Sequence, residues 1–177
     1  HSAKWTWLFG WLFHFALLLA FFRHLRYATD PVWFWVSWEI VQAAGHYAAY
    51  MMLLGLIGLL VRRIFVDRVR HISAPSDYLI LILIIGIALS GLMMKWYPTD
   101  IFALKQFIIG LIYFSWSELP SDFMLLLHLG LVILLMIIFP YSKLLHAPGL
   151  FFSPTRNQTD TARDSRHIAD WARKLES

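Results

Sequence analysis

Four long apolar segments constrain this chain more than any other feature of its sequence. Each is close to the roughly 20 residues that an α-helix needs to cross the hydrocarbon core of a bilayer, which is about 30 Å thick. The chain is 59% hydrophobic and only 15% charged, which is too apolar for a soluble domain of 177 residues. The segments are Lys4–Arg26, Glu39–Val61, Tyr78–Trp96 and Phe123–Leu145. The sequence therefore predicts an all-α fold, an integral membrane bundle of four transmembrane helices.

A fifth apolar segment, Ile101–Trp116, is interrupted by Lys105, Gln106 and Ser115. It lies among loops rich in Trp and Tyr, which settle at the interface between membrane and water. We expect this segment to form a helix that lies in the outer interface. A fifth span is the alternative, but it would place the basic C-terminal tail outside the cell.

The basic residues predict the orientation of the bundle, because cytoplasmic loops carry an excess of Lys and Arg. With four spans, eleven of the fifteen basic residues fall on one side of the membrane. The other four are Arg23, Arg26, Lys95 and Lys105. We therefore expect a multi-pass protein of a bacterial or archaeal cytoplasmic membrane, with its C-terminus in the cytoplasm. The same bias explains the pI of about 9.5 without a nucleic-acid partner.

Residues 1–149 are predicted to form the membrane domain, and residues 150–177 a polar, basic cytoplasmic tail. The abrupt start of the sequence predicts a further N-terminal helix before it. The chain has no cysteine, so it supplies no disulfide, no c-type haem attachment and no iron–sulfur cluster. Any such centre would belong to a partner protein.

Two of the spans carry two histidines each. His14 and His24 are ten residues apart in the first, or about 15 Å along a helix, and His128 and His146 are eighteen apart in the last. The two helices run in opposite directions, so His24 comes level with His128, and His14 with His146. Two facing imidazoles are the axial ligands that a six-coordinate haem iron needs. The pattern predicts two haem b groups, whereas hydrogen bonds between helices are the alternative role for these side chains.

The spacings agree only in part with this pairing. Eighteen residues make five helical turns, so His128 and His146 would share a face, whereas His14 and His24 are about 80° apart around their helix. The axial separations, about 15 Å and about 27 Å, also differ. We expect tilt and a bend near Pro140, which cannot donate a backbone hydrogen bond, to absorb the difference.

Other polar residues near the spans are weaker candidates. Arg62, Arg63 and Lys143 flank the inner face, where haem propionates need cations, although the positive-inside bias explains them equally well. Glu39 and His46 lie toward the outer start of the second span and are candidates for a quinone site, with a structural role for His46 as the alternative. No carboxylate lies deep within a span, which disfavours a proton or cation carrier.

Four segments resemble the gamma subunit of respiratory nitrate reductase, the membrane cytochrome b called NarI. They are "FHFALLLAFFRH", "LLVRRIFVDRVR", "SDYLILILII" and "LLLHLGLVILLMIIFPYSKLLHAPG", within Trp5–Gly149. The axial histidines of that family have the same ten- and eighteen-residue spacings. The resemblance implies that His24 and His128 hold an outer haem, and that His14 and His146 hold an inner one.

The resemblance departs from the nitrate reductase pattern at two places. That pattern has a lysine that helps to bind quinol near the outer start of the helix after the first histidine pair, where this sequence has Ser37 and Glu39. The tail segments "APGLFFSPTRNQTD" and "RHIADW" resemble instead DsrM, the NarI-like subunit of the membrane complex linked to dissimilatory sulfite reductase. This implies a cytoplasmic iron–sulfur partner like DsrK, and further subunits like DsrJ, DsrO and DsrP.

These resemblances imply an electron-transfer function. The chain would pass electrons between menaquinol or menaquinone in the membrane lipid and a cytoplasmic iron–sulfur subunit. It would be the redox subunit of a quinone-linked oxidoreductase complex of dissimilatory sulfur metabolism. The alternatives are the nitrate reductase gamma subunit proper and, from a different class, a non-redox membrane scaffold or small transporter.

Overall fold

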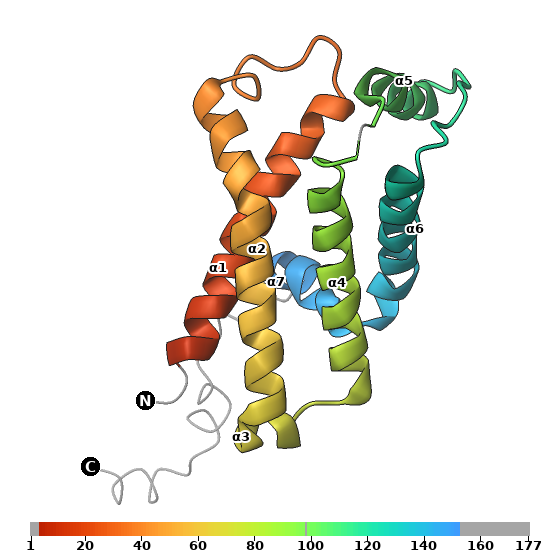
Figure 1. The fold of residues 1–177 in the computed structure, drawn as a ribbon. Coiled ribbons are helices and arrows are strands. Elements are labelled where there is room, and N and C mark those ends of the chain that lie inside the picture. Colours follow the sequence, from red (N-terminus) through yellow and green to blue (C-terminus); the bar gives the residue numbers. More distant parts are fainter. Residues whose placement is uncertain (1–3, 98, 153–177) are drawn as a thin grey trace, which may run out of the picture. The chain divides into compact units, whose positions relative to one another are not determined.

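The computed structural model describes residues 4–97 and 99–152, and within these ranges the chain is helical, with no β-strand (Figure 1). It divides into two compact units, one up to Ile138 and one from Phe139 onward. The α-helices of the first unit are α1 (Lys4–His24), α2 (Glu39–Phe65), α3 (Asp67–His71), α4 (Pro75–Met93), α5 (Ile101–Ile112) and α6 (Phe123–Ile138). The second unit contains α7 (His146–Phe152). The predicted all-α fold is confirmed.

Four helices in the described ranges are long and apolar enough to cross a membrane. They span Lys4–Tyr27, which includes a short 3₁₀ turn after α1, Glu39–Phe65, Pro75–Met93 and Phe123–Tyr141. The third begins three residues earlier than predicted because Pro75 occupies a first-turn position that proline favours, and the Asp77 carboxylate accepts the Ala74 amide hydrogen at 3.0 Å. The four predicted spans are confirmed, and the chain is a multi-pass membrane protein.

The fifth apolar segment forms α5, which is twelve residues long. Asp100 caps its N-terminus by accepting the Ala103 amide hydrogen at 2.9 Å. Twelve residues extend about 18 Å, which is too short to cross the bilayer core. α5 lies crosswise beyond the ends of α4 and α6 (Figure 1), and Lys105 joins it to Asp30 of the loop after α1 through an ion pair of 2.9 Å. Its length is that of the predicted interfacial helix and not of the alternative fifth span.

The helices of the first unit pack as a row, in which α1 packs along α2, α2 along α4, and α4 along α6. At one end of this unit α1 ends, α2 begins and α5 lies (Figure 1). We call it the α5 end. Small residues bring α1 and α2 together, as is usual between membrane helices. At Gly55 a Cβ atom would lie 2.9 Å from the Phe13 amide nitrogen and 3.0 Å from the Phe9 carbonyl oxygen. This contact fixes the helix that carries His14 and His24.

The last span corrects one prediction. The sequence predicts one helix over Phe123–Leu145, but α6 ends at Ile138 and is followed by two 3₁₀ turns. Pro140 has no amide hydrogen, and its ring clashes with the carbonyl four residues earlier, which disfavours the α-helical conformation at this point. His128 and His146 therefore do not share one face of one straight helix, and the expected bend near Pro140 is a break.

The division between the two units falls after Ile138 in the sequence, whereas the predicted boundary between membrane domain and tail falls after residue 149. That boundary stays a prediction. The tail from Ser153 onward lies outside the described residues, together with most of the two segments that resemble DsrM.

An ion pair ties the end of α2 to the start of α4. Arg63 Nη1 donates to Asp77 Oδ2 at 3.1 Å and to Ser73 Oγ at 2.9 Å, and the Tyr78 hydroxyl donates to the Arg63 carbonyl at 2.9 Å. The Asp77 side chain is only 7% exposed. Its buried carboxylate therefore depends on the Arg63 guanidinium for charge compensation.

We expect Arg63→Ala to lower the free energy of unfolding by about 1–3 kcal/mol, because it removes the guanidinium that pairs with the buried Asp77 carboxylate. The measurement is chemical or thermal unfolding of the purified protein in detergent. Arg70→Ala is the matched control, because the Arg70–Asp67 pair is 57% and 78% exposed and surface pairs contribute little. Equal losses in the two variants would contradict this account of the pair.

Candidate functional site: facing histidines on α1 and α6

The structure brings the His24 and His128 imidazole rings close together. His24 is the last residue of α1 and His128 lies in the second turn of α6, so they come from the two ends of the row of packed helices. Their ring centroids are 6.5 Å apart and their planes differ by only 16°. The row therefore curls at the α5 end, where it brings these two imidazoles together.

The spacing of the two rings fits one metal ion between them. An imidazole nitrogen binds a first-row metal at about 2 Å, and its ring centre lies about 1 Å behind it, so two imidazoles on opposite sides of one ion have centres about 6 Å apart. The part of the chain that the structure describes holds no group of three or more His, Cys, Asp or Glu side chains that suits a metal ion. Two axial ligands are sufficient for a haem iron, because the porphyrin fills the other four positions.

The Nδ1 atom of each of the four predicted ligands makes a hydrogen bond within the chain. A carbonyl oxygen only accepts, so an Nδ1 bonded to a carbonyl carries the proton, and Nε2 is then the nitrogen with a lone pair. Such a bond to the second nitrogen is typical of metal-bound histidine. The Nδ1 partners are the Gly10 carbonyl for His14 (2.7 Å), the Ala20 carbonyl for His24 (2.6 Å), the Ser90 hydroxyl for His128 (3.0 Å) and the Lys143 carbonyl for His146 (2.9 Å).

This hydrogen-bond pattern is not sufficient by itself to identify a ligand. His71, at the exposed end of α3, makes the same bond to the Asp67 carbonyl at 2.7 Å. What distinguishes His24 and His128 is the combination of the Nδ1 bonds with a facing partner ring. The second predicted pair is divided between the two units, with His14 on α1 and His146 at the start of α7, and its pairing stays a prediction.

The predicted propionate-binding cations differ in their partners. Arg63 is engaged in the ion pair with the buried Asp77 carboxylate, so its charge is already compensated. Arg62 Nε donates to Thr6 Oγ1 at 2.9 Å, next to the N-terminal end of α1. Lys143 belongs to the second unit, in the 3₁₀ turn before α7.

The two quinone-site candidates lie at the α5 end. Glu39 is the exposed first residue of α2. His46 lies two turns further along, with its ring next to Tyr50 (centroids 6.4 Å apart), and its carbonyl accepts a hydrogen bond from Lys95 Nζ at 3.2 Å. Lys95 Nζ also lies 4.7 Å from the centre of the Tyr50 ring, a cation–π distance.

The sequence did not predict that Lys95 contacts the turn of α2 that carries His46 and Tyr50. The Arg23 side chain packs against Gly45, so a cation from α1 and a cation from the turn after α4 lie near His46. Partial burial of the Lys95 ammonium lowers its pKa, and the nearby positive charge of Arg23 lowers it further. The sequence signal was weak, because Lys95 follows an apolar span and precedes Trp96, as an ordinary interfacial anchor would.

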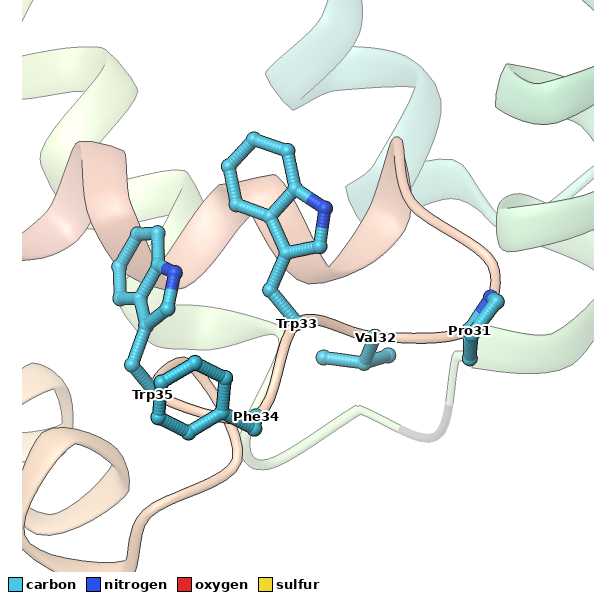
Figure 2. A pocket seen from close by; sticks show the side chains of 5 residues that line it. All are labelled: Pro31, Val32, Trp33, Phe34 and Trp35. Atoms are coloured by element: carbon cyan, nitrogen blue, oxygen red, sulfur yellow. The ribbon is translucent and has the colours of Figure 1, made fainter.

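A shallow aromatic hollow lies in the loop between α1 and α2. It is lined by residues 31–35, and Figure 2 shows the Trp33 and Trp35 indoles on the same side of this loop. The Trp35 ring meets Phe22 of α1 edge to face, with centroids 5.7 Å apart. The hollow offers an apolar, aromatic surface.

Known proteins similar to this chain are named as subunits of a reductase or an oxidoreductase. Residues 3–159 match the family described as nitrate reductase gamma subunit. The chain is 39% identical to the "Hdr-like menaquinol oxidoreductase cytochrome b-like subunit" of Archaeoglobus fulgidus and 34% identical to that of Archaeoglobus profundus. Both alignments cover 96% of this chain and 55% of the relative, so the chain spans about half the length of these relatives. The chain belongs to the nitrate reductase gamma subunit family.

Proposed function

We propose that this chain is a membrane cytochrome b that transfers electrons from menaquinol to a partner protein. The observation that carries the proposal is the facing pair of His24 and His128, whose rings lie 6.5 Å apart and nearly parallel. The names of both Archaeoglobus relatives favour menaquinol as the electron donor over the nitrate reductase alternative.

The two pairs of histidines hold two haem b groups in this proposal. His24 and His128 hold one through Nε2, and His14 and His146 hold the second. Each bound haem supplies an iron that accepts and releases one electron. Because His14 and His24 share α1, their ten-residue interval sets the two redox centres at different depths, about 15 Å apart along the helix.

The α5 end is the proposed quinol site. Lys95 stands beside His46 here, and it takes the place of the lysine that the nitrate reductase pattern has near Ser37 and Glu39. Its ammonium is a donor for a quinone oxygen, and the His46 imidazole and Glu39 carboxylate are acceptors for protons. Oxidation of menaquinol releases two electrons and two protons, so a site that accepts protons must adjoin the first redox centre.

The opposite end is the proposed exit for electrons. Arg62, Arg63 and Lys143 are the cations that we assign to the inner haem propionates, and Arg63 also pairs with Asp77. The electron acceptor is a cytoplasmic iron–sulfur subunit like DsrK, since this chain has no cysteine to hold a cluster. We place the chain in a dissimilatory sulfur complex with further subunits like DsrJ, DsrO and DsrP, and the C-terminus in the cytoplasm.

We expect the protein purified from haem-replete membranes to contain two b-type haems per chain. Pyridine haemochrome analysis measures the haem content, and a reduced-minus-oxidised spectrum shows the α-bands. A short-chain menaquinol added to the oxidised protein should produce the same bands. A folded preparation without haem would contradict the proposal and favour the scaffold or transporter class; a haem-loaded protein that menaquinol does not reduce would contradict only the choice of donor.

A further inference from the structure

Ser90 is a buried hydroxyl in the last turn of α4. Within the described ranges it is the one polar residue in the buried class, with 4% of its surface exposed. It belongs to α4, which carries none of the proposed haem ligands. Burying a hydroxyl is costly unless it is hydrogen-bonded, and Ser90 makes two bonds, to the Ile87 carbonyl and to His128 Nδ1, both at 3.0 Å.

The first of these bonds already satisfies the hydroxyl donor. Serine in a helix commonly donates to a carbonyl in the preceding turn, and Ile87 is three residues earlier. The contact with His128 is therefore additional, and it links α4 to α6. Gly91, the next residue, adds to this contact, because a Cβ atom there would lie 3.2 Å from His128 Cε1. Ser90 and Gly91 are therefore the α4 residues against which the His128 ring packs.

The two hydrogen bonds of Ser90 allow only one placement of the protons when Nε2 of His128 binds iron. The neutral ring then carries its proton on Nδ1. Nδ1–H donates to the Ser90 oxygen, and the Ser90 hydroxyl donates to the Ile87 carbonyl. The chain of two hydrogen bonds runs from the ligand into the backbone of α4, and every donor and acceptor in it is satisfied.

We propose that Ser90 is a positioning residue for His128, which fixes the protonated nitrogen and the orientation of this axial ligand and lowers the reduction potential of its haem. The inference rests on the proposed function, because it takes His128 as a haem ligand. An acceptor at Nδ1 makes an imidazole a stronger electron donor to its metal, and this favours oxidised iron. For His24 a carbonyl of its own helix does this, whereas His128 depends on α4.

The test is redox titration of the full-length haem-loaded protein with Ser90→Ala, Ser90→Cys and Ser90→Thr. We expect Ser90→Ala to keep two haems and to raise the ratio of reduced to oxidised haem at a fixed potential by about two- to tenfold for one haem only. A tenfold change corresponds to 59 mV for a one-electron couple. Electron paramagnetic resonance of the oxidised protein should show an altered signal for the same haem.

The other two variants separate hydrogen bonding from packing. Ser90→Thr keeps the hydroxyl and should restore the wild-type potential, whereas Ser90→Cys keeps the volume but is a weak acceptor and should behave like Ser90→Ala. Loss of one haem in Ser90→Ala and Ser90→Cys but not in Ser90→Thr would also support the inference. Unchanged potentials of both haems in Ser90→Ala would overturn the inference, and so would equal haem loss in all three variants. Neither result would contradict the proposed function, which is tested by the haem content of the wild-type protein.

Discussion

Replacing His24 with alanine is expected to reduce the haem content from two groups per chain to about one. His24 faces His128 across 6.5 Å, and a haem with one axial histidine removed is bound far less tightly. The other haem uses different side chains and should remain. Haem content by pyridine haemochrome and the number of components in a redox titration measure the result. The same haem should be lost in His128→Ala.

His71→Ala is the matched control for this experiment. Its Nδ1 makes the same bond to a helix carbonyl as His24, but it lies at the exposed end of α3. We expect it to keep both haems. The double variant of His24 and His128 should lose no more haem than either single variant, because the two residues serve one group. Two haems in His24→Ala, or additional loss in the double variant, would contradict the assignment of this pair.

The second large effect is expected from a single methyl group at Gly55. In Gly55→Ala the new Cβ would lie 2.9 Å from a backbone nitrogen and 3.0 Å from a backbone oxygen of α1, and backbone atoms cannot move aside without separating the helices. We expect a loss of about 1–3 kcal/mol in unfolding free energy, despite the better helix propensity of alanine. Because α1 carries both His14 and His24, the variant should also release both haems more readily on heating.

Gly86→Ala on α4 is the control for this substitution. Its Cβ would meet the Leu131 side chain at 3.5 Å, an ordinary van der Waals distance. We expect its unfolding free energy to stay equal to that of the wild type or to rise by up to about 1 kcal/mol. Thermal unfolding in detergent, followed together with the haem absorbance, compares the two variants. Similar stability of both would show that the α1–α2 contact does not hold the haem-bearing helix.

Much of the fold follows from the sequence because membrane helices are read from length and apolar composition. The start of α2 at Glu39 agrees with the prediction, and α5 is short because polar residues interrupt its apolar segment. The break after Ile138 was harder to predict. Pro140 signals a disturbance, but whether a helix bends or ends at proline depends on the packing and hydrogen bonding of the freed backbone groups.

The candidate site is only partly readable from the sequence. The histidines stand out because imidazoles are rare within apolar spans. Arg63 looked like a propionate partner, and only the structure reveals its bond to the buried Asp77. Ser90 and Lys95 gave little signal, because a serine within a span and a lysine just beyond one are common. Their contacts with His128 and His46 are made across helices that are distant in the sequence.

By itself, the sequence determined a helical membrane protein with four spans, two of them with a predicted pair of histidines, because local composition decides whether a segment enters a bilayer. The tertiary structure decided which side chains meet. It set His24 opposite His128, gave His128 a hydrogen-bond partner on α4, and brought Lys95 to the turn of α2 that carries His46. These contacts depend on the tilt, rotation and close approach of packed helices. Those are set by interlocking shapes such as the Gly55 contact, which no single segment encodes.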